Sequence, residues 1–423
     1  MRLKSKLELR EPIEFAWLLG LAFFLPLFEA PKNLCWLGYV STWLYNRIRG
    51  RDWGGRWDGW DSLIVVWIAS GYIVAAFAGV HHDEWSAAND ILRYGSVLWL
   101  VKRSRYNERA RLAVLSVLVA STLIALAWGY WTLYVSKTDV YLSLNSVGNV
   151  NHSAIYLAIV FGVALSLGLA YWSQLAVAGR MMIGLTTLAL GISVFFTDSR
   201  AAALAAVLFA LVFTLVFFAR QGKRISTSVV AVGFAATVML ALNPGILEKT
   251  ADQSAQGLVL SKRDKIWKNG LVEWRRFPLF GVGMGNFGRV TLVELQDWNK
   301  TQNWTIRPSA EGLYPHGHSL YVTALAERGA FGTAILLAVL LCWAGTLAQA
   351  IPRSQDPSVE WALFGAALAG WLITVVAGVV NTTLHHEHAI LSVLLLALWL
   401  NHRAAPASPG QMESRPPARQ PSS

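Results

Sequence analysis

The sequence predicts an all-α, polytopic transmembrane protein with about twelve spans and one large, partly helical loop outside the cytoplasm. Of its 423 residues, 55% are hydrophobic and only 14% are charged, whereas charged residues form about a quarter of a typical soluble domain. Repeated apolar runs are long enough to cross a bilayer. This composition excludes a soluble globular domain, and we interpret most of the net charge of +11 as a topology signal rather than a nucleic-acid surface.

Hydropathy and charge together define four regions. We expect nine spans in residues 1–242, a loop outside the cytoplasm in residues 243–318, three further spans in residues 319–401 and a disordered cytoplasmic tail in residues 402–423. The second and fourth spans are the weakest, because they are short or carry charged residues. The predicted spans are residues 13–29, 33–47, 60–80, 86–101, 112–135, 153–172, 180–197, 201–219, 225–242, 320–349, 360–380 and 385–401.

Basic residues gather in alternate short connections. They precede the first span and follow the second, fourth and eighth, at positions that include Arg10, Arg47, Arg105 and Arg220. Under the positive-inside rule these connections are cytoplasmic, and so are both termini. The long connection after the ninth span therefore faces away from the cytoplasm.

That long connection is unusually basic for the outer side of a membrane. We interpret most of its lysines as solvated surface residues. Several arginines, however, can converge on an anionic group, since guanidinium forks match phosphate bidentately. Residues 261–274 carry apolar side chains at helical spacing, which predicts an amphipathic helix against the membrane surface that starts near Arg263 and ends before Pro278. The Gly-Val-Gly-Met-Gly turn at residues 281–285 predicts close backbone packing near a ligand rather than nucleotide binding.

His318 stands where this connection enters the tenth predicted span. A lone histidine there is usually solvated or caps the helix, but this one accompanies the arginines and has Glu327 and Arg328 beyond it in the span. Ionisable residues in or beside a span indicate a functional site. His316, two residues earlier, is expected to point to another face.

Several short segments occur in a fixed order: Gly148-Asn-Val-Asn-His152, Asp198-Ser-Arg-Ala201, Arg263 with Trp267, Pro278-Leu-Phe-Gly-Val-Gly-Met-Gly-Asn-Phe287, and His318-Ser-Leu-Tyr321 followed by Glu327 and Gly329. Together they resemble the O-antigen ligase/polymerase superfamily, over about residues 145 to 332. The sequence departs from many members of that superfamily at Ser319, where they have Asn.

The resemblance implies a metal-independent, inverting glycosyltransferase of the bacterial inner membrane whose site faces the periplasm. Such an enzyme moves O-antigen polysaccharide from undecaprenyl diphosphate to lipid A-core in lipopolysaccharide biosynthesis. It implies no cofactor and no nucleic-acid partner. The alternatives are an O-antigen polymerase that joins lipid-linked repeat units and, less favoured, a transporter of lipid-linked oligosaccharide, for which paired discontinuous spans are missing from the sequence.

We expect arginines to bind the donor. Arg200 and Arg263 are predicted to hold the diphosphate and to stabilise the charge that develops on it as the glycosidic C–O bond breaks. Arg289 is predicted as a third ligand. Asn151 and Tyr321 are predicted as further substrate-binding residues.

His318 is predicted to orient or deprotonate the acceptor hydroxyl, because an unperturbed histidine pKa of about 6.5 suits base chemistry near neutrality. With Arg200 and Arg263 it forms the predicted catalytic set. Two other clusters, residues 81–84 and residues 385–388, fall on predicted outer loops and together offer zinc ligands. Neither has the His-Glu-x-x-His spacing of a catalytic zinc helix, so we predict no metal.

Overall fold

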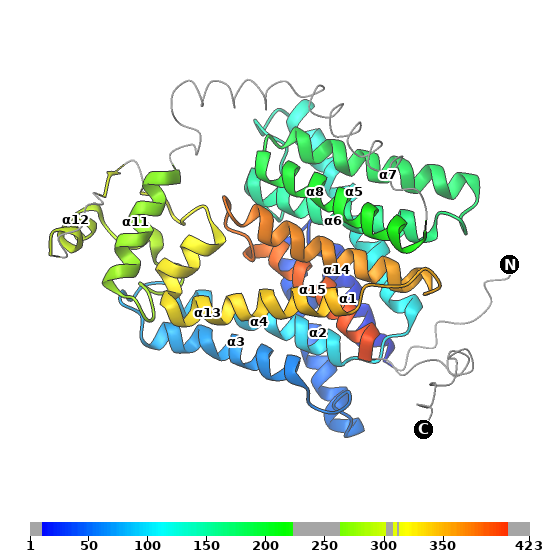
Figure 1. Ribbon diagram of the computed structural model, residues 1–423, viewed down its shortest axis with the longest axis horizontal. Helices are drawn as coiled ribbons and strands as arrows, with labels where there is room; N and C mark the ends of the chain where they lie inside the picture. The colour runs from blue at the N-terminus through cyan, green and yellow to red at the C-terminus, as the bar shows by residue number, and fades with distance from the viewer. Residues whose placement is uncertain (1–10, 223–262, 302–307, 311–312, 405–423) are drawn as a thin grey trace, which may run out of the picture.

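The computed structural model describes residues 11–222, 263–301, 308–310 and 313–404, and these ranges contain helices and no strand (Figure 1). The predicted all-α class is therefore confirmed for the described part of the chain. The helices are α1 (Pro12–Phe24), α2 (Glu29–Gly50), α3 (Gly59–Ala76), α4 (Glu84–Arg103), α5 (Glu108–Tyr134), α6 (Val150–Tyr171), α7 (Val177–Phe196), α8 (Arg200–Arg220), α11 (Arg263–Arg276), the 3-10 helix η1 (Phe287–Arg289), α12 (Leu292–Thr301), α13 (Leu320–Gln349), α14 (Ser358–Ala377) and α15 (His386–Ala404).

Seven of the described helices are long and apolar enough to cross a membrane, namely α3, α5, α6, α7, α8, α13 and α14. Helix α1 is apolar but shorter, and α2 and α4 coincide with the two spans expected to be weakest. The predicted ninth span, residues 225–242, lies outside the described residues, whereas each other predicted span coincides with a helix. The chain is a multi-pass helical membrane protein; the total number of spans, the region boundaries and the periplasmic side of the loop stay predictions.

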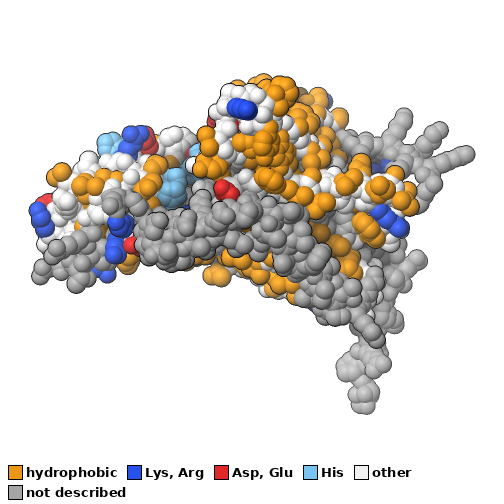
Figure 2. Space-filling view, turned by 90° about the horizontal axis from the view of Figure 1, so that it is seen from above, with side chains coloured by type: hydrophobic (Ala, Val, Ile, Leu, Met, Phe, Trp, Pro, Cys, Tyr) orange, Lys and Arg blue, Asp and Glu red, His pale blue; other side chains and the backbone are white. Residues whose placement is uncertain are grey.

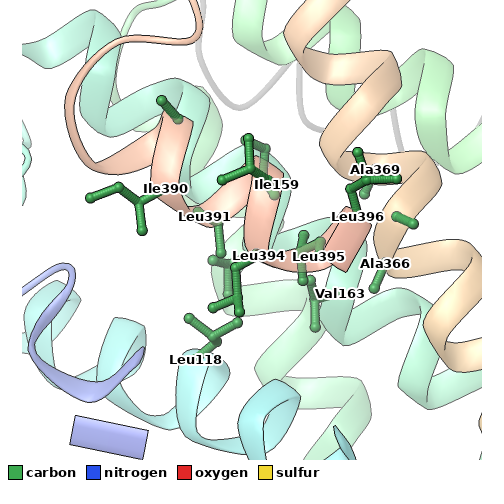
Figure 3. Close-up of a cluster of buried hydrophobic side chains, with 14 of the residues drawn as sticks. Leu118, Ile159, Val163, Ala366, Ala369, Ile390, Leu391, Leu394, Leu395 and Leu396 are labelled. Carbon is green, nitrogen blue, oxygen red and sulfur yellow. The ribbon is translucent and has the colours of Figure 1, made fainter. Parts of the chain in front are cut away.

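Helix α15 forms the centre of the bundle. Its residues 387–401 are all buried, because α4, α6 and α14 pack around it, as expected for a helix that is apolar on every side. Figure 3 shows aliphatic side chains of α15 packed with Leu118 of α5, Ile159 of α6 and Ala369 of α14. Small residues bring α6 and α14 close, since a Cβ on Gly162 would lie 2.4 Å from the Cβ of Ala369.

Helix α13 is interrupted at Gly329, whose φ of 60° and ψ of −166° are not helical. The interruption frees backbone groups that an unbroken helix would pair with each other, and within a membrane protein such groups need other partners. The Gly-rich loop before η1 supplies them. The bonds run from Val282 N to Ala326 O (2.9 Å), Gly283 N to Glu327 O (3.0 Å), Ala330 N to Pro278 O (2.8 Å) and Phe331 N to Leu279 O (3.1 Å).

The glycines of this loop permit the close approach. Gly281 has a φ of 71°, and a Cβ there would lie 2.4 Å from the carbonyl oxygen of Ala326. On its other edge the loop accepts hydrogen bonds from the α3–α4 connection, where Gly79 N donates to Gly281 O at 3.0 Å and Val80 N donates to Val282 O at 3.1 Å. The predicted close backbone packing is therefore present, and its partners are α13 and the α3–α4 connection.

Helix α11 covers Arg263–Arg276 among the described residues, and it ends before Pro278 as the apolar spacing predicted. The face that we expected to lie on the membrane surface instead packs against α13. A Cβ on Gly270 would lie 2.9 Å from Val322 and 3.0 Å from the ring of Phe287. The helix is thereby held over the first turns of α13.

A network of ion pairs lies at the opposite end of the bundle, near the start of α3. Asp61 is fully buried and pairs with Lys102 at 2.8 Å and with Arg103 at 2.7 Å, both from the end of α4. Arg111 Nε donates to Asn401 Oδ1 at 2.8 Å. The basic connections that we assigned to the cytoplasm thus meet at one end, while the α3–α4 connection and α11 lie at the other.

The interruption in α13 generates a test of the fold. In a Gly329→Ala variant the new Cβ would lie 2.3 Å from the backbone of Leu279, in a conformation that alanine avoids at a cost of about 1–3 kcal/mol. We expect a clearly lower midpoint of thermal unfolding in detergent. Gly345→Ala is the matched control on the same helix, because a Cβ there meets no atom within 4 Å. Equal midpoints for the two variants would contradict this account of the interruption.

Candidate functional site

The first residues of several helices meet the α14–α15 connection at one end of the bundle. Ser199 Oγ, just before α8, donates to Asn151 Oδ1 at the start of α6 at 3.1 Å. Arg263 donates a longer bond, 3.5 Å, to Asn381 Oδ1 in the α14–α15 connection. Figure 2 shows charged and histidine side chains at the end that carries α11 and α12, while hydrophobic side chains cover much of the bundle. This end of the bundle therefore carries charged and histidine side chains together.

Arg200 and Arg263 lie close to each other here. Each is partly buried; Arg200 is the first residue of α8, and Arg263 is the first described residue of α11. Burial and the neighbouring charge of Arg200 lower the pKa of Arg263. Unpaired amide groups at a helix start also carry partial positive charge. Two guanidinium groups and the start of α8 make this an electropositive place that favours a multiply charged anion.

His318 lies beside this arginine pair, in the segment that leads into α13. Its backbone has a φ of 45°, a left-handed conformation that is uncommon for histidine and often occurs at functional sites. Burial, His316 and Arg263 lower the pKa of His318 to about 4. The expected unperturbed pKa is therefore wrong, because burial and nearby positive charge both disfavour the protonated ring.

The expectation that His316 points to another face is also wrong. The rings of His316 and His318 are 4.4 Å apart. Trp267 Nε1 of α11 donates to the carbonyl oxygen of Gly317, between them, at 3.1 Å. The segment is bent at His318, so alternate residues do not separate as they would in an extended strand.

Further histidines extend this group. The ring of His152, at the start of α6, lies 6.3 Å from that of His316, 5.8 Å from His385, 5.2 Å from His386 and 5.2 Å from His388. The sequence pattern did not show that His152 joins the other histidines, because α6 and α15 are more than two hundred residues apart. Only their packing side by side in the bundle brings the rings together.

Residues 81–84 do not take part in this histidine cluster among the described contacts. His81 Nδ1 lies 3.0 Å from Glu84 Oε1. Asp83 pairs with Arg289, whose Nε and Nη2 donate to one carboxylate oxygen at 2.9 and 2.6 Å. Residues 81–84 and residues 385–388 thus do not form a joint zinc site among the described residues. Arg289 has a carboxylate partner and is more than half exposed, so its predicted role in binding diphosphate stays untested.

The two other predicted binding residues, Asn151 and Tyr321, each form a side-chain hydrogen bond within the protein. Asn151 accepts the hydrogen bond from Ser199 described above. Tyr321 is half-buried on the first turn of α13, and its hydroxyl donates to the carbonyl oxygen of Val375 at 3.0 Å. Both roles in substrate binding stay predictions. The three predicted catalytic residues, Arg200, Arg263 and His318, are the ones that the fold brings together.

A family model described as O-antigen ligase matches residues 185–337 of this chain. The matched range contains Arg200, Arg263 and His318, together with the interruption of α13 and the loop that pairs with it. It ends before the α14–α15 connection and begins after His152. No curated protein matches the chain.

Proposed function

We propose that this chain is an O-antigen ligase, starting from the match of residues 185–337 to a family model described as O-antigen ligase. It transfers O-antigen polysaccharide from undecaprenyl diphosphate to lipid A-core, at the periplasmic face of the bacterial inner membrane. The observation that supports this proposal is the meeting of Arg200 and Arg263 beside His318, at the end of the bundle away from the basic connections.

The donor carries its own energy in the bond between the sugar and the lipid diphosphate. As the anomeric C–O bond breaks, negative charge grows on the diphosphate that leaves. Arg200 and Arg263 stabilise that charge more in the transition state than in the ground state, which is the condition for a faster reaction. The two guanidinium groups supply this positive charge themselves, so the proposed transfer needs no metal ion and no other cofactor.

The acceptor is a hydroxyl group of lipid A-core. His318 is neutral at pH 7, because its pKa is lowered to about 4, and a neutral imidazole accepts a hydrogen bond from that hydroxyl. The hydroxyl oxygen attacks the anomeric carbon, its proton passes to His318, and the diphosphate leaves from the opposite side. A single displacement of this kind inverts the configuration at the anomeric carbon.

The family match also covers the polymerase alternative, because a polymerase uses the same class of donor and differs in its acceptor. Transfer by the purified protein therefore needs both acceptors in parallel: lipid A-core, and a lipid-linked repeat unit. We expect glycan on lipid A-core and no longer lipid-linked chain. Growth of the lipid-linked chain with unmodified lipid A-core would identify a polymerase instead.

Lysine substitutions test the arginine pair. An ammonium keeps the charge but loses the planar fork that matches phosphate, so Arg200→Lys and Arg263→Lys should each lower the transfer rate about 100-fold, the usual effect of removing one donor to a developing charge. Arg276→Lys, at the exposed end of the same helix α11, is the control and should be nearly normal. If both site variants transfer at the normal rate while inserted in the membrane, the pair has a structural role.

Removal of the imidazole tests His318. His318→Ala should lower turnover by about two to four orders of magnitude, with donor binding almost unchanged because both arginines remain. Cells with this variant should accumulate undecaprenyl-linked O-antigen and show bare lipid A-core. His82→Ala, an exposed histidine outside the cluster, serves as control. Loss of donor binding with normal turnover at high donor concentration would show that His318 binds the donor rather than accepting the proton.

The pH dependence of transfer tests the state of His318. Because its pKa is lowered to about 4, the neutral ring persists below pH 6.5, and kcat/KM should fall only as the pH approaches 4. A bound diphosphate offsets the charge of Arg263 and raises the pKa of His318, so the acid limb of kcat should lie at higher pH than that of kcat/KM. Acid limbs near pH 6.5 in both profiles would contradict the assigned environment.

A further inference from the structure

We propose that His152, His385 and His386 form a binding site for a late first-row divalent transition metal, for which Zn²⁺ is the probe. The site is separate from the arginine pair and takes no part in the proposed transfer. It comes from two parts of the chain, the start of α6 and the end of the α14–α15 connection with the first residue of α15, that both lie outside the match to the O-antigen ligase family.

The geometry of the three rings supports this site. One ring nitrogen from each histidine lies within 4.8 Å of the corresponding nitrogen of the other two. A tetrahedral Zn²⁺ with nitrogen ligands at 2.0–2.1 Å places neighbouring ligand atoms about 3.4 Å apart. Small rotations of side chains are enough to reach that spacing. Three imidazoles are also a ligand set that zinc, copper and nickel favour over magnesium or calcium.

The local backbone brings the rings of two consecutive histidines, His385 and His386, close to each other. Leu384 and His386 both have a left-handed backbone, with φ of 52° and 50°, and such conformations cluster at ligand clamps. The rings of His385 and His386 are 3.8 Å apart as a result. The next residue, Glu387, forms a buried ion pair with Lys32 of α2, which fixes the first turn of α15.

The three proposed ligands range from buried to exposed, so an ion could reach the site from the solvent. His152 is buried, His385 is intermediate and His386 is exposed. The Nδ1 atom of His385 is buried and has no hydrogen-bond partner in the described part of the structure. A buried polar atom without a partner is costly, and coordination by a metal would satisfy it. The exposed His386 leaves the ion open to solvent on one side.

A metal here would join two segments that support the arginine pair. His152 follows Asn151, which accepts a hydrogen bond from Ser199 next to Arg200. His385 lies four residues after Asn381, which accepts the bond from Arg263. The bound ion therefore acts as a clamp between α6 and the α14–α15 connection, and binding to the folded state alone raises stability.

Metal binding by the purified full-length protein tests this site directly. The protein is isolated through a tag without histidine, treated with a chelator and dialysed, then titrated with Zn²⁺ by calorimetry. We expect one Zn²⁺ per chain and a higher midpoint of thermal unfolding with the metal. Co²⁺ in place of Zn²⁺ should give the absorption bands of a tetrahedral site.

Two variants define the ligands. His386→Ala, at the exposed ligand, should weaken Zn²⁺ binding at least about tenfold and abolish the rise in the unfolding midpoint, while its midpoint without metal matches the wild type. His81→Ala/His82→Ala removes two exposed histidines outside the cluster and should bind Zn²⁺ normally. The proposal is overturned if the wild type binds no Zn²⁺, or if His386→Ala binds it as tightly as the wild type does. Both results are independent of whether the protein transfers O-antigen.

Discussion

The interruption of α13 at Gly329 is the constraint on which the candidate site depends. An unbroken helix would pair Ala330 N with Ala326 O and Phe331 N with Glu327 O. The loop of residues 278–283 takes all four groups instead, each at 2.8–3.1 Å. Because this loop follows α11 directly, the pairing fixes α11 against the first turns of α13. Arg263, at the start of α11, and His318, just before α13, are thereby held at the same end of the bundle.

The second constraint is electrostatic. Two partly buried guanidinium groups near each other are unfavourable in the absence of an anion, as the lowered pKa of Arg263 indicates. Burial, together with the charges of His316 and Arg263, keeps the ring of His318 neutral. In the proposed reaction, this arrangement supplies both donors for the group that leaves and a neutral acceptor for the proton that is lost. Binding of an anion relieves the repulsion and makes the imidazole more basic.

Sequence patterns predicted the elements better than their contacts. The helical spans and the end of α11 before Pro278 followed from hydropathy and helical spacing, because these patterns depend on neighbours along the chain. The ring positions of His152 and His316 did not, since they depend on how α6, α15 and the bend at His318 come together. The pKa expected for His318 was wrong for the same reason, because burial and proximity to His316 and Arg263 are properties of the packed bundle. The ion pair of Arg289 with Asp83 joins residues more than two hundred positions apart, and no local pattern shows it.

Several of the short motifs that resemble the O-antigen ligase superfamily lie where α11, the Gly-rich loop and α13 pack against one another. Glycines at positions 281 and 329 are needed where backbones touch, and the aromatic and histidine residues around them complete the contact.

The most direct measurement of the central claim is an experimental structure of the protein in lipid nanodiscs with undecaprenyl diphosphate bound. Our account predicts the diphosphate within hydrogen-bond reach of both Arg200 and Arg263, with the imidazole of His318 facing the side from which an acceptor approaches. A diphosphate bound at the opposite end of the bundle, or in contact with neither arginine, would contradict it.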